Sequence, residues 1–263
     1  MDDGVEETWN MLDPLDAAHV ATSMVILTNK DEQLQVLMQE NHEGPFAGKF
    51  TLPNMLVSGE LTIEDASTSL KAHFELADLK LEHSSTFSYP RLDPRGRVIN
   101  IAMVGAAPRS RLNLLMTRND LALIDVQIVD GEAFLSAGGR SIRVGFCHDG
   151  LIANVVESLR QAADYSLLPF AFLEEAFTHC DLRKVHQAIL DKEFTPQFLR
   201  KKMNNRVFYG DRMIVRTGGR RLGELGKPAE LYKIAIVTAA EREYKRKATQ
   251  NQKKREKLQR EGF

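Results

Sequence analysis

The sequence predicts an α+β protein built in two parts. Apolar runs typical of strands dominate the first 145 residues, and one amphipathic helical segment interrupts them. Helical patterns take over from residue 148. The chain has 263 residues, of which 43% are apolar and 27% are charged, so it can bury the core of one large domain or of two medium ones.

The first part begins with a predicted β-hairpin. Two apolar runs, "MVIL" and "LQVLM", are joined by the polar turn "TNKDEQ". Further β-rich or apolar runs are "FTLPNMLVS", "GRVINIAMVGAAP", "LALIDVQIV" and "IRVGF". Between Ile63 and Leu76 apolar residues recur at three- and four-residue spacing, and Thr62 stands where it can cap the first turn. One helix among many strands predicts an α+β sandwich.

The second part is predicted to be mainly helical. The patterns "HDGLIANVVESLRQAA" and "DLRKVHQAILDKE" each have an aspartate in cap position, Asp149 and Asp181. The segment "SLLPFAFLEEAF" lies between the two patterns. Thr195 followed by Pro196 predicts a new helix after a short turn, which gives a helix-turn-helix. The strands "RVFYGDRMIVRTGG" and "PAELYKIAIV" follow, around the glycine-rich loop "RTGGRRLGELGKP". This order is the winged-helix pattern.

Charge separates the two parts more sharply than composition does. Residues 181–263 carry 22 Lys and Arg against 10 Asp and Glu, whereas residues 1–180 carry 13 against 26. A basic C-terminal third on an acidic body indicates that only this third meets a polyanion such as nucleic acid. The acidic start "MDDGVEETWN" and the lack of an apolar run of about 18 residues predict a cytoplasmic protein that does not enter the membrane. The spacing of Cys147 and Cys180 predicts reduced thiols.

Two segments carry a family resemblance. "GPFAGKFTLPNMLVSGE" with the helix after it, and "YPRLDPRGRVINIAMVGAAP", resemble a Nudix domain over residues 18–145. Together with residues 148–237 the pattern is similar to the Nudix-related transcriptional regulators, and a basic tail follows at 238–263. The resemblance implies a Nudix-like α/β/α sandwich with a mixed sheet, then a winged helix-turn-helix domain. It also implies a homodimer that binds a double-stranded DNA operator and a nucleotide-type effector such as ADP-ribose.

The Nudix signature of this chain lacks its metal-binding carboxylates. With the first glycine of the signature aligned on Asn54, Glu60 matches the first glutamate. The later Arg-Glu and Glu-Glu pairs of the signature fall on polar or apolar side chains in this register (Thr68, Ser69, Ala72, His73) and in the neighbouring one (Ser69, Leu70, His73, Phe74). Because magnesium needs oxygen ligands at fixed positions, we predict no catalytic residue, no metal and no cofactor. The alternatives are a magnesium-dependent Nudix-type pyrophosphohydrolase with displaced ligands, and an interaction scaffold with a vestigial pocket.

The resemblance implies a ligand site at Lys49, Glu60, Arg95 and Arg97. The two arginines lie in "RLDPRGR" and can pair with phosphates through bidentate, charge-assisted bonds. A different nucleotide, a sugar derivative or no ligand at all stays open as an alternative.

The predicted DNA-reading helix runs from Pro196 to Asn204. In its first turns an amide such as that of Gln197 can bond adenine, and Arg200 can bond guanine. Cations in the helix and in the wing would hold phosphates. The full set of predicted DNA-binding residues is Thr195, Gln197, Arg200, Lys201, Lys202, Arg220, Arg221 and Lys227. From these residues we predict a DNA-binding transcriptional regulator, acting as a repressor, with a nucleotide-sensing domain that does not hydrolyse.

Overall fold

The structure is a computed structural model that describes residues 18–90, 92–164, 166–204, 207–208, 211–222 and 228–235. Its contacts divide the chain into two compact units. The first comprises Met1–Glu174 with Cys180–Phe194, and the second comprises Glu175–His179 with Thr195–Phe263. The domain limits 18–145 and 148–237 remain a prediction, and the predicted tail 238–263 lies outside the described residues. None of the described helices is long and apolar enough to cross a membrane.

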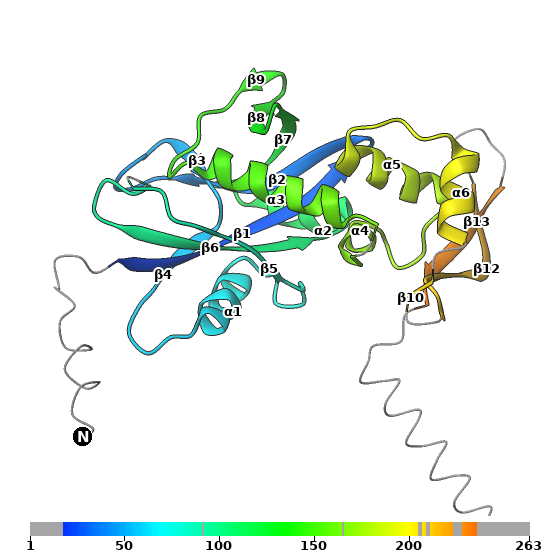
Figure 1. Cartoon of the computed structure of the whole chain (residues 1–263), viewed down its shortest axis with the longest axis horizontal. Coiled ribbons are helices and arrows are strands. Elements are labelled where there is room, and N and C mark those ends of the chain that lie inside the picture. Colours follow the sequence, from blue (N-terminus) through cyan, green and yellow to red (C-terminus); the bar gives the residue numbers. More distant parts are fainter. Residues whose placement is uncertain are drawn as a thin grey trace, which may run out of the picture. The chain divides into compact units, whose positions relative to one another are not determined.

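The first unit is built on a mixed sheet of nine strands (Figure 1). The strand order is β5-β6-β1-β2-β7-β8-β9, with β3 paired to β2 and β4 paired to β1. The β1–β6 pair is parallel and the other pairs of this sheet are antiparallel. The strands are β1 (His19–Lys30), β2 (Gln33–Asn41), β3 (Lys49–Thr51), β4 (Asn54–Val57), β5 (Glu82–Phe87), β6 (Val98–Ala106), β7 (Leu121–Val129), β8 (Glu132–Ala137) and β9 (Arg140–Ser141).

The predicted N-terminal hairpin is confirmed as β1 and β2. The strands pair out to Lys30 and Gln33, so the turn is shorter than the polar segment "TNKDEQ" suggested. Asp31 makes this tight turn possible by adopting a left-handed conformation, with φ of 52°. The hairpin formed by β8 and β9 was not predicted, because "EAFLSAGGRS" holds too few consecutive apolar residues to suggest strands.

Helix α1 (Ile63–His73) confirms the predicted helix and its cap. Thr62 accepts a hydrogen bond from the backbone of Asp65, and the Asp65 side chain accepts one from the backbone of Thr62. This capping box satisfies donors that a helix start would otherwise leave open. The apolar face of α1 packs with the short helices α2 (Arg109–Asn113) and η3 (Leu114–Thr117) on a core that includes Met24, Ile26 and Leu37.

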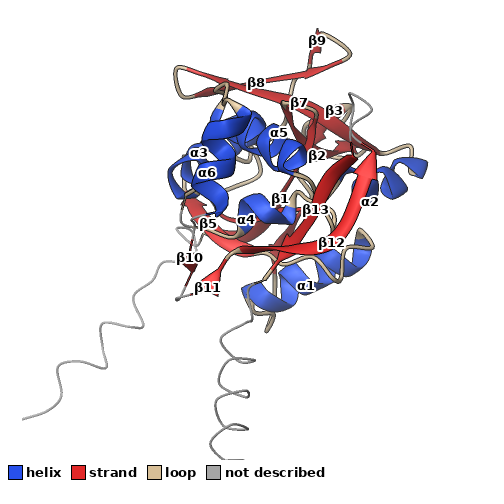
Figure 2. Cartoon of the chain, turned by 90° about the vertical axis from the view of Figure 1, so that its right-hand side faces the viewer, coloured by secondary structure: helices blue, strands red, loops and turns tan. Residues whose placement is uncertain are grey.

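Helix α3 (His148–Ala162) covers the opposite face of the sheet (Figure 2). It contacts β5, β6 and β8. The prediction that Asp149 caps this helix was wrong: the helix starts at His148, two residues before the start that a cap at Asp149 implies, because Phe146 and Cys147 both adopt left-handed conformations that turn the chain into it. Asp149 instead lies in the first turn, where its negative charge interacts favourably with the positive end of the helix dipole.

Two further helices follow in this part of the chain. The helical prediction for "SLLPFAFLEEAF" holds only for α4 (Leu168–Ala171). Helix α5 (His179–Leu190) begins before Asp181, so the prediction that Asp181 caps it was wrong. Arg160 of α3 donates from Nε to the carbonyl oxygen of Ile189, and Lys184 lies 3.1 Å from Asp31. From Cys180 onward, α5 therefore belongs to the first unit.

In its described residues the second unit contains a helix and two antiparallel strand pairs. Its elements are α6 (Pro196–Asn204), the short pair β10 (Val207–Phe208) and β11 (Asp211–Arg212), and the antiparallel pair β12 (Ile214–Leu222) and β13 (Pro228–Ile234). Phe177 adds a bridge beside β13 by exchanging both backbone hydrogen bonds with Tyr232. Phe177, Met213 and Tyr232 are buried.

Candidate functional site: a ligand pocket and a DNA-binding surface

The loop and helix that match the Nudix signature present no metal site. Glu60 is exposed in the turn between β4 and α1, and Asp65 is engaged with Thr62 in the capping box. Hydrogen bonds from Thr62 lower the pKa of the Asp65 carboxyl, which holds it in the charged acceptor form. Among the described residues no cluster of three His, Cys, Asp or Glu side chains could hold a metal ion. The residues of this segment therefore do not fit the magnesium that the Nudix resemblance implies.

A cavity of about 380 Å³ lies where β2, β3 and β4 meet the loop before α3. Its lining is polar and comes from five segments of the first unit. Among the described residues that line it, Arg95 is the one lysine or arginine, and Glu40 and Glu43 supply carboxylates. The lining residues are Gln39, Glu40, Asn41, His42, Glu43, Pro45, Thr51, Asn54, Arg95 and Phe146.

Arg95 is held in place at this cavity by Asp93. The Arg95 Nε and Nη2 atoms both donate to the Asp93 carboxylate, and the ion pair measures 2.6 Å. The Asp93 side chain is buried, whereas that of Arg95 is 59% exposed. The hydrogen bonds from Arg95 lower the pKa of Asp93, so the carboxylate stays charged and keeps the guanidinium oriented. Because Nη1 is not used in this pair, Arg95 can offer it to an anionic ligand.

A small inner recess of about 30 Å³ adjoins this cavity and shares Asn54, Arg95 and Phe146 with it. Asn100 and His148 line the recess. Asn100 is 2% exposed and donates to Ser23, while its Oδ1 atom has no hydrogen-bond partner in the described part of the chain. A buried polar atom of this kind is normally paired, so its place in the recess points to a polar guest of about the size of one water molecule or hydroxyl group.

His148 is a neutral hydrogen-bond donor at the same recess. Its Nδ1 atom accepts a hydrogen bond of 2.9 Å from the backbone N–H of Leu52. Burial lowers the pKa of His148 from 6.5 to about 3, so the ring is neutral near pH 7 and its proton must lie on Nε2. His148 is also the first residue of α3, so a guest in the recess would touch the start of that helix.

The loop before α3 is held in a costly conformation. Phe146 and Cys147 have φ angles of 57° and 51°, and Phe46 across the cavity mouth has φ of 66°. The rings of Phe46 and Phe146 meet edge to face, with centroids 4.8 Å apart. Left-handed residues other than glycine cost roughly 1–3 kcal/mol each and gather at functional sites. Among the described residues, three of the seven non-glycine residues with positive φ therefore lie at or next to this cavity.

The other residues predicted for the ligand site lie outside the lining. Lys49 places its ammonium 5.0 Å from the centroid of the Phe46 ring. Arg97 donates to the Ser88 hydroxyl at 2.7 Å, and Glu60 projects from its turn. Of the four predicted residues, Arg95 alone lines the cavity or its recess. Sequence reasoning missed Asn100 and His148; a lone asparagine inside the apolar run "VINIAMV" was the available signal for the first.

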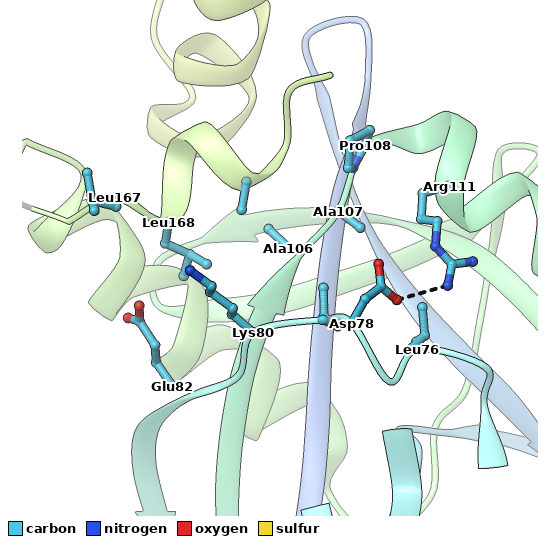
Figure 3. Close-up of a pocket in the computed structure, with 12 residues that line it drawn as sticks. Leu76, Asp78, Lys80, Glu82, Ala106, Ala107, Pro108, Arg111, Leu167 and Leu168 are labelled. Atoms are coloured by element: carbon cyan, nitrogen blue, oxygen red, sulfur yellow. Dashed lines mark hydrogen bonds and ion pairs between the residues drawn. The ribbon is translucent and has the colours of Figure 1, made fainter. Parts of the chain in front are cut away.

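A second cavity, of about 400 Å³, lies beside β6, α2 and α4 (Figure 3). Leu76, Ala107 and Leu168 contribute to its apolar floor, and the pair formed by Arg111 and Asp78 lies at its edge, with a separation of 3.1 Å. None of the residues predicted for function lines this cavity. Because its floor is apolar, it presents fewer polar groups to a nucleotide than the cavity around Arg95 does.

In the second unit, α6 presents a polar surface. Thr195 caps the helix, because its hydroxyl accepts a hydrogen bond from the backbone N–H of Phe198. Leu199 and Met203 are buried with exposures of 2% and 1%. The predicted base-reading residues Gln197, Arg200 and Lys201 are exposed, and Lys202 is half-buried. The predicted cap and the start of this helix at Pro196 are confirmed.

The hairpin of β12 and β13 stands where the sequence predicts the wing. The glycine-rich segment is less of a loop than predicted, because β12 continues through it to Leu222. A bulge between Arg216 and Arg220, with Gly218 at φ of 83°, absorbs the glycines. The predicted contacts Arg220 and Arg221 are therefore exposed strand residues, whereas Lys227 lies outside the described residues.

Comparison with known proteins agrees with this architecture. Residues 169–234 match the family model of the NrtR DNA-binding winged helix domain. None of the curated proteins matches the chain. The crystal structure of Shewanella oneidensis NrtR complexed with a 27mer DNA is similar at a TM-score of 0.68, with 24% identity over 82% of this chain and 93% of that chain.

A second solved structure extends the likeness. A MutT/nudix family protein from Enterococcus faecalis matches at a TM-score of 0.64, with 17% identity over 88% of this chain and 94% of that one. At these identities the likeness establishes the fold, including the mixed sheet of the first unit and the helix and hairpin of the second. The chain therefore joins a domain with the fold of these proteins to a segment that matches the NrtR DNA-binding winged helix model.

Proposed function

We propose that this protein is a DNA-binding transcriptional repressor whose Nudix-like domain senses a nucleotide metabolite such as ADP-ribose without hydrolysing it. The observation that carries the proposal is helix α6. It lies inside the segment that matches a DNA-binding winged helix, it is capped at Thr195, and it exposes Gln197, Arg200 and Lys201. A helix of this kind fits the major groove, where arginine and amide side chains distinguish bases.

The test of DNA binding is a pair of double variants. Arg200→Ala with Lys201→Ala removes two exposed cations from α6, and we expect specific DNA binding to be lost while the fold is kept. Lys30→Ala with Arg143→Ala is the matched control, because it removes the same charge from exposed positions of the first unit. DNA selected from random sequence by the wild type is titrated with each protein. Equal affinity of both double variants for the selected DNA would contradict the proposal.

The geometry around Arg95 supports a sensor of phosphate-containing ligands. Asp93 orients the guanidinium at the mouth of the cavity, and the recess next to it offers Asn100 and His148 to uncharged polar groups. A nucleoside diphosphate sugar carries both phosphates and uncharged hydroxyl groups. Because the segment matching the Nudix signature does not fit a magnesium ion, binding without turnover is the outcome we propose for such a ligand.

The ligand is tested by the thermal midpoint of the protein in the presence of ADP-ribose. A ligand at 100 times its dissociation constant stabilises the fold by about 2.7 kcal/mol. We expect Arg95→Ala to weaken binding tenfold or more, because a charge-assisted bond to phosphate contributes about 1.5–3 kcal/mol. Arg97→Ala is the control, since Arg97 is engaged with Ser88 away from the cavity lining. Equal weakening by both variants would argue against a phosphate site at Arg95.

Regulation requires that the ligand discriminate between two states of the protein. We propose a homodimer on a pseudo-palindromic operator, in which the ligand binds the DNA-bound and the DNA-free states with different affinity. Light scattering at several concentrations measures the oligomeric state. Adding ADP-ribose to the protein–DNA complex then measures the coupling, and an unchanged operator affinity at saturation would exclude ADP-ribose as the effector.

A further inference from the structure

Phe198 is an exposed aromatic residue in the first turn of the DNA-reading helix. Its side chain is 53% exposed, although the neighbouring Leu199 is only 2% exposed. The helix thus buries Leu199 and Met203 and leaves a large apolar ring on its polar side. A ring in this position is accessible to whatever the helix binds.

The position of Phe198 on α6 follows from helix geometry. Successive residues are about 100° apart around a helix, which puts Gln197 and Lys201 near the middle of the face opposite Leu199 and Met203. Phe198 lies next to that middle, on the side away from Arg200. Because Thr195 fixes the first turn through the backbone N–H of Phe198, the ring projects from the end of the helix that enters the groove in helix-turn-helix proteins.

The surroundings of the ring favour DNA over a protein partner. A stable protein interface buries about 800 Å² on each side, whereas a half-exposed phenylalanine offers on the order of 100 Å². Its neighbours on the exposed face, Gln197 and Lys201, are polar or cationic. An exposed apolar ring beside hydrogen-bond donors suits a surface that is polar except for isolated methyl groups.

We propose that Phe198 is a specificity-determining residue that contacts the C5 methyl group of a thymine in the operator. In the major groove thymine is the base that presents an apolar group, and phenylalanine is one of the side chains that contact it. This inference rests on the proposed DNA-binding function and adds a base preference to it. The flanking Gln197 would then read a base next to this thymine.

The test compares thymine with uracil, which differ only in the C5 methyl group. DNA is first selected by the wild-type chain, and each thymine of the selected site is then replaced singly by deoxyuridine. We expect one thymine in each half-site at which the wild type loses about fourfold in affinity, which corresponds to one buried methyl group. Phe198→Ala should lose the same factor on thymine DNA and show no further loss at that position on uracil DNA.

Two controls separate a base contact from a general effect. Phe198→Leu keeps an apolar side chain and should retain part of the difference between thymine and uracil. Leu222→Ala removes an exposed apolar residue from the hairpin instead and should leave the full difference in place. Since Phe198 is half exposed, the thermal midpoint of Phe198→Ala should stay close to that of the wild type.

The outcomes distinguish this inference from the proposed function. A wild-type protein that selects no DNA would overturn both. Specific DNA binding with no loss at any uracil position, or a full loss that persists in Phe198→Ala, would overturn the thymine contact alone.

Discussion

Replacement of His148 tests whether the recess is built around a buried neutral imidazole. His148 is 1% exposed, and its Nδ1 atom accepts the backbone hydrogen bond of Leu52. His148→Asn keeps a small side chain with an acceptor for Leu52 and removes the titrating ring. His148→Leu removes both the ring and the acceptor, and thereby leaves the buried N–H of Leu52 without a partner.

The magnitude follows from the pKa of His148. Burial lowers this pKa from 6.5 to about 3. On acidification the imidazole is therefore protonated near pH 6.5 in the unfolded chain but only near pH 3 in the folded chain. The contribution of His148 to the free energy of unfolding is therefore complete above pH 6.5 and declines as the pH falls toward 3. Between about pH 7 and 5 the decline amounts to about 2 kcal/mol.

Urea unfolding followed by far-UV circular dichroism at several pH values measures this decline. His148→Asn should lose about 2 kcal/mol less than the wild type between about pH 7 and 5. His148→Leu should show the same flatter dependence, with stability lower by about 1–3 kcal/mol at every pH because of the unpaired Leu52 N–H. If the wild type and His148→Asn lose stability equally on acidification, His148 is not the buried neutral group described above.

Three further predictions concern the first unit, two on its stability and one on its activity. Thr62→Ala should cost about 1 kcal/mol by removing the cap of α1, whereas Thr68→Ala on the exposed side of the same helix should cost nothing, as measured by urea unfolding. Gly105→Ala should cost about 1–3 kcal/mol, because the new Cβ would lie 2.8 Å from a side chain and 2.9 Å from a backbone carbonyl; Gly96→Ala, with open space around it, is the control for the same unfolding assay. Magnesium with ADP-ribose should give no hydrolysis by chromatography, and turnover that Glu60→Gln removes would support the enzyme alternative.

Local patterns in the sequence were sufficient for several elements. Two apolar runs joined by a polar turn between Val20 and Glu40 predicted the hairpin, and the Thr62 and Thr195 caps predicted where α1 and α6 begin. These features depend on neighbours within a few residues, so the sequence contains what decides them. The cap predicted at Asp149 failed because a left-handed turn at Phe146 and Cys147 starts that helix earlier, and the cap predicted at Asp181 failed because α5 already begins at His179.

The candidate pocket depended on long-range contacts that no local pattern contains. Arg95 was predicted from the motif "RLDPRGR", whereas its orientation by Asp93 and its place in the cavity required the folded chain. Asn100 and His148 are separated by 48 positions in the sequence and meet at the recess because α3 packs over the sheet. The burial that keeps His148 neutral has the same origin.

The sequence by itself determined that the chain has two parts of opposite charge and that a capped basic helix starts at Pro196. Composition and short-range spacing decide these properties. Only the tertiary structure decided that Arg97 and Lys49 lie away from the cavity lining and that Asn100 and His148 form its recess. Sheet pairing and helix packing set those positions, because they bring together residues that are far apart along the chain.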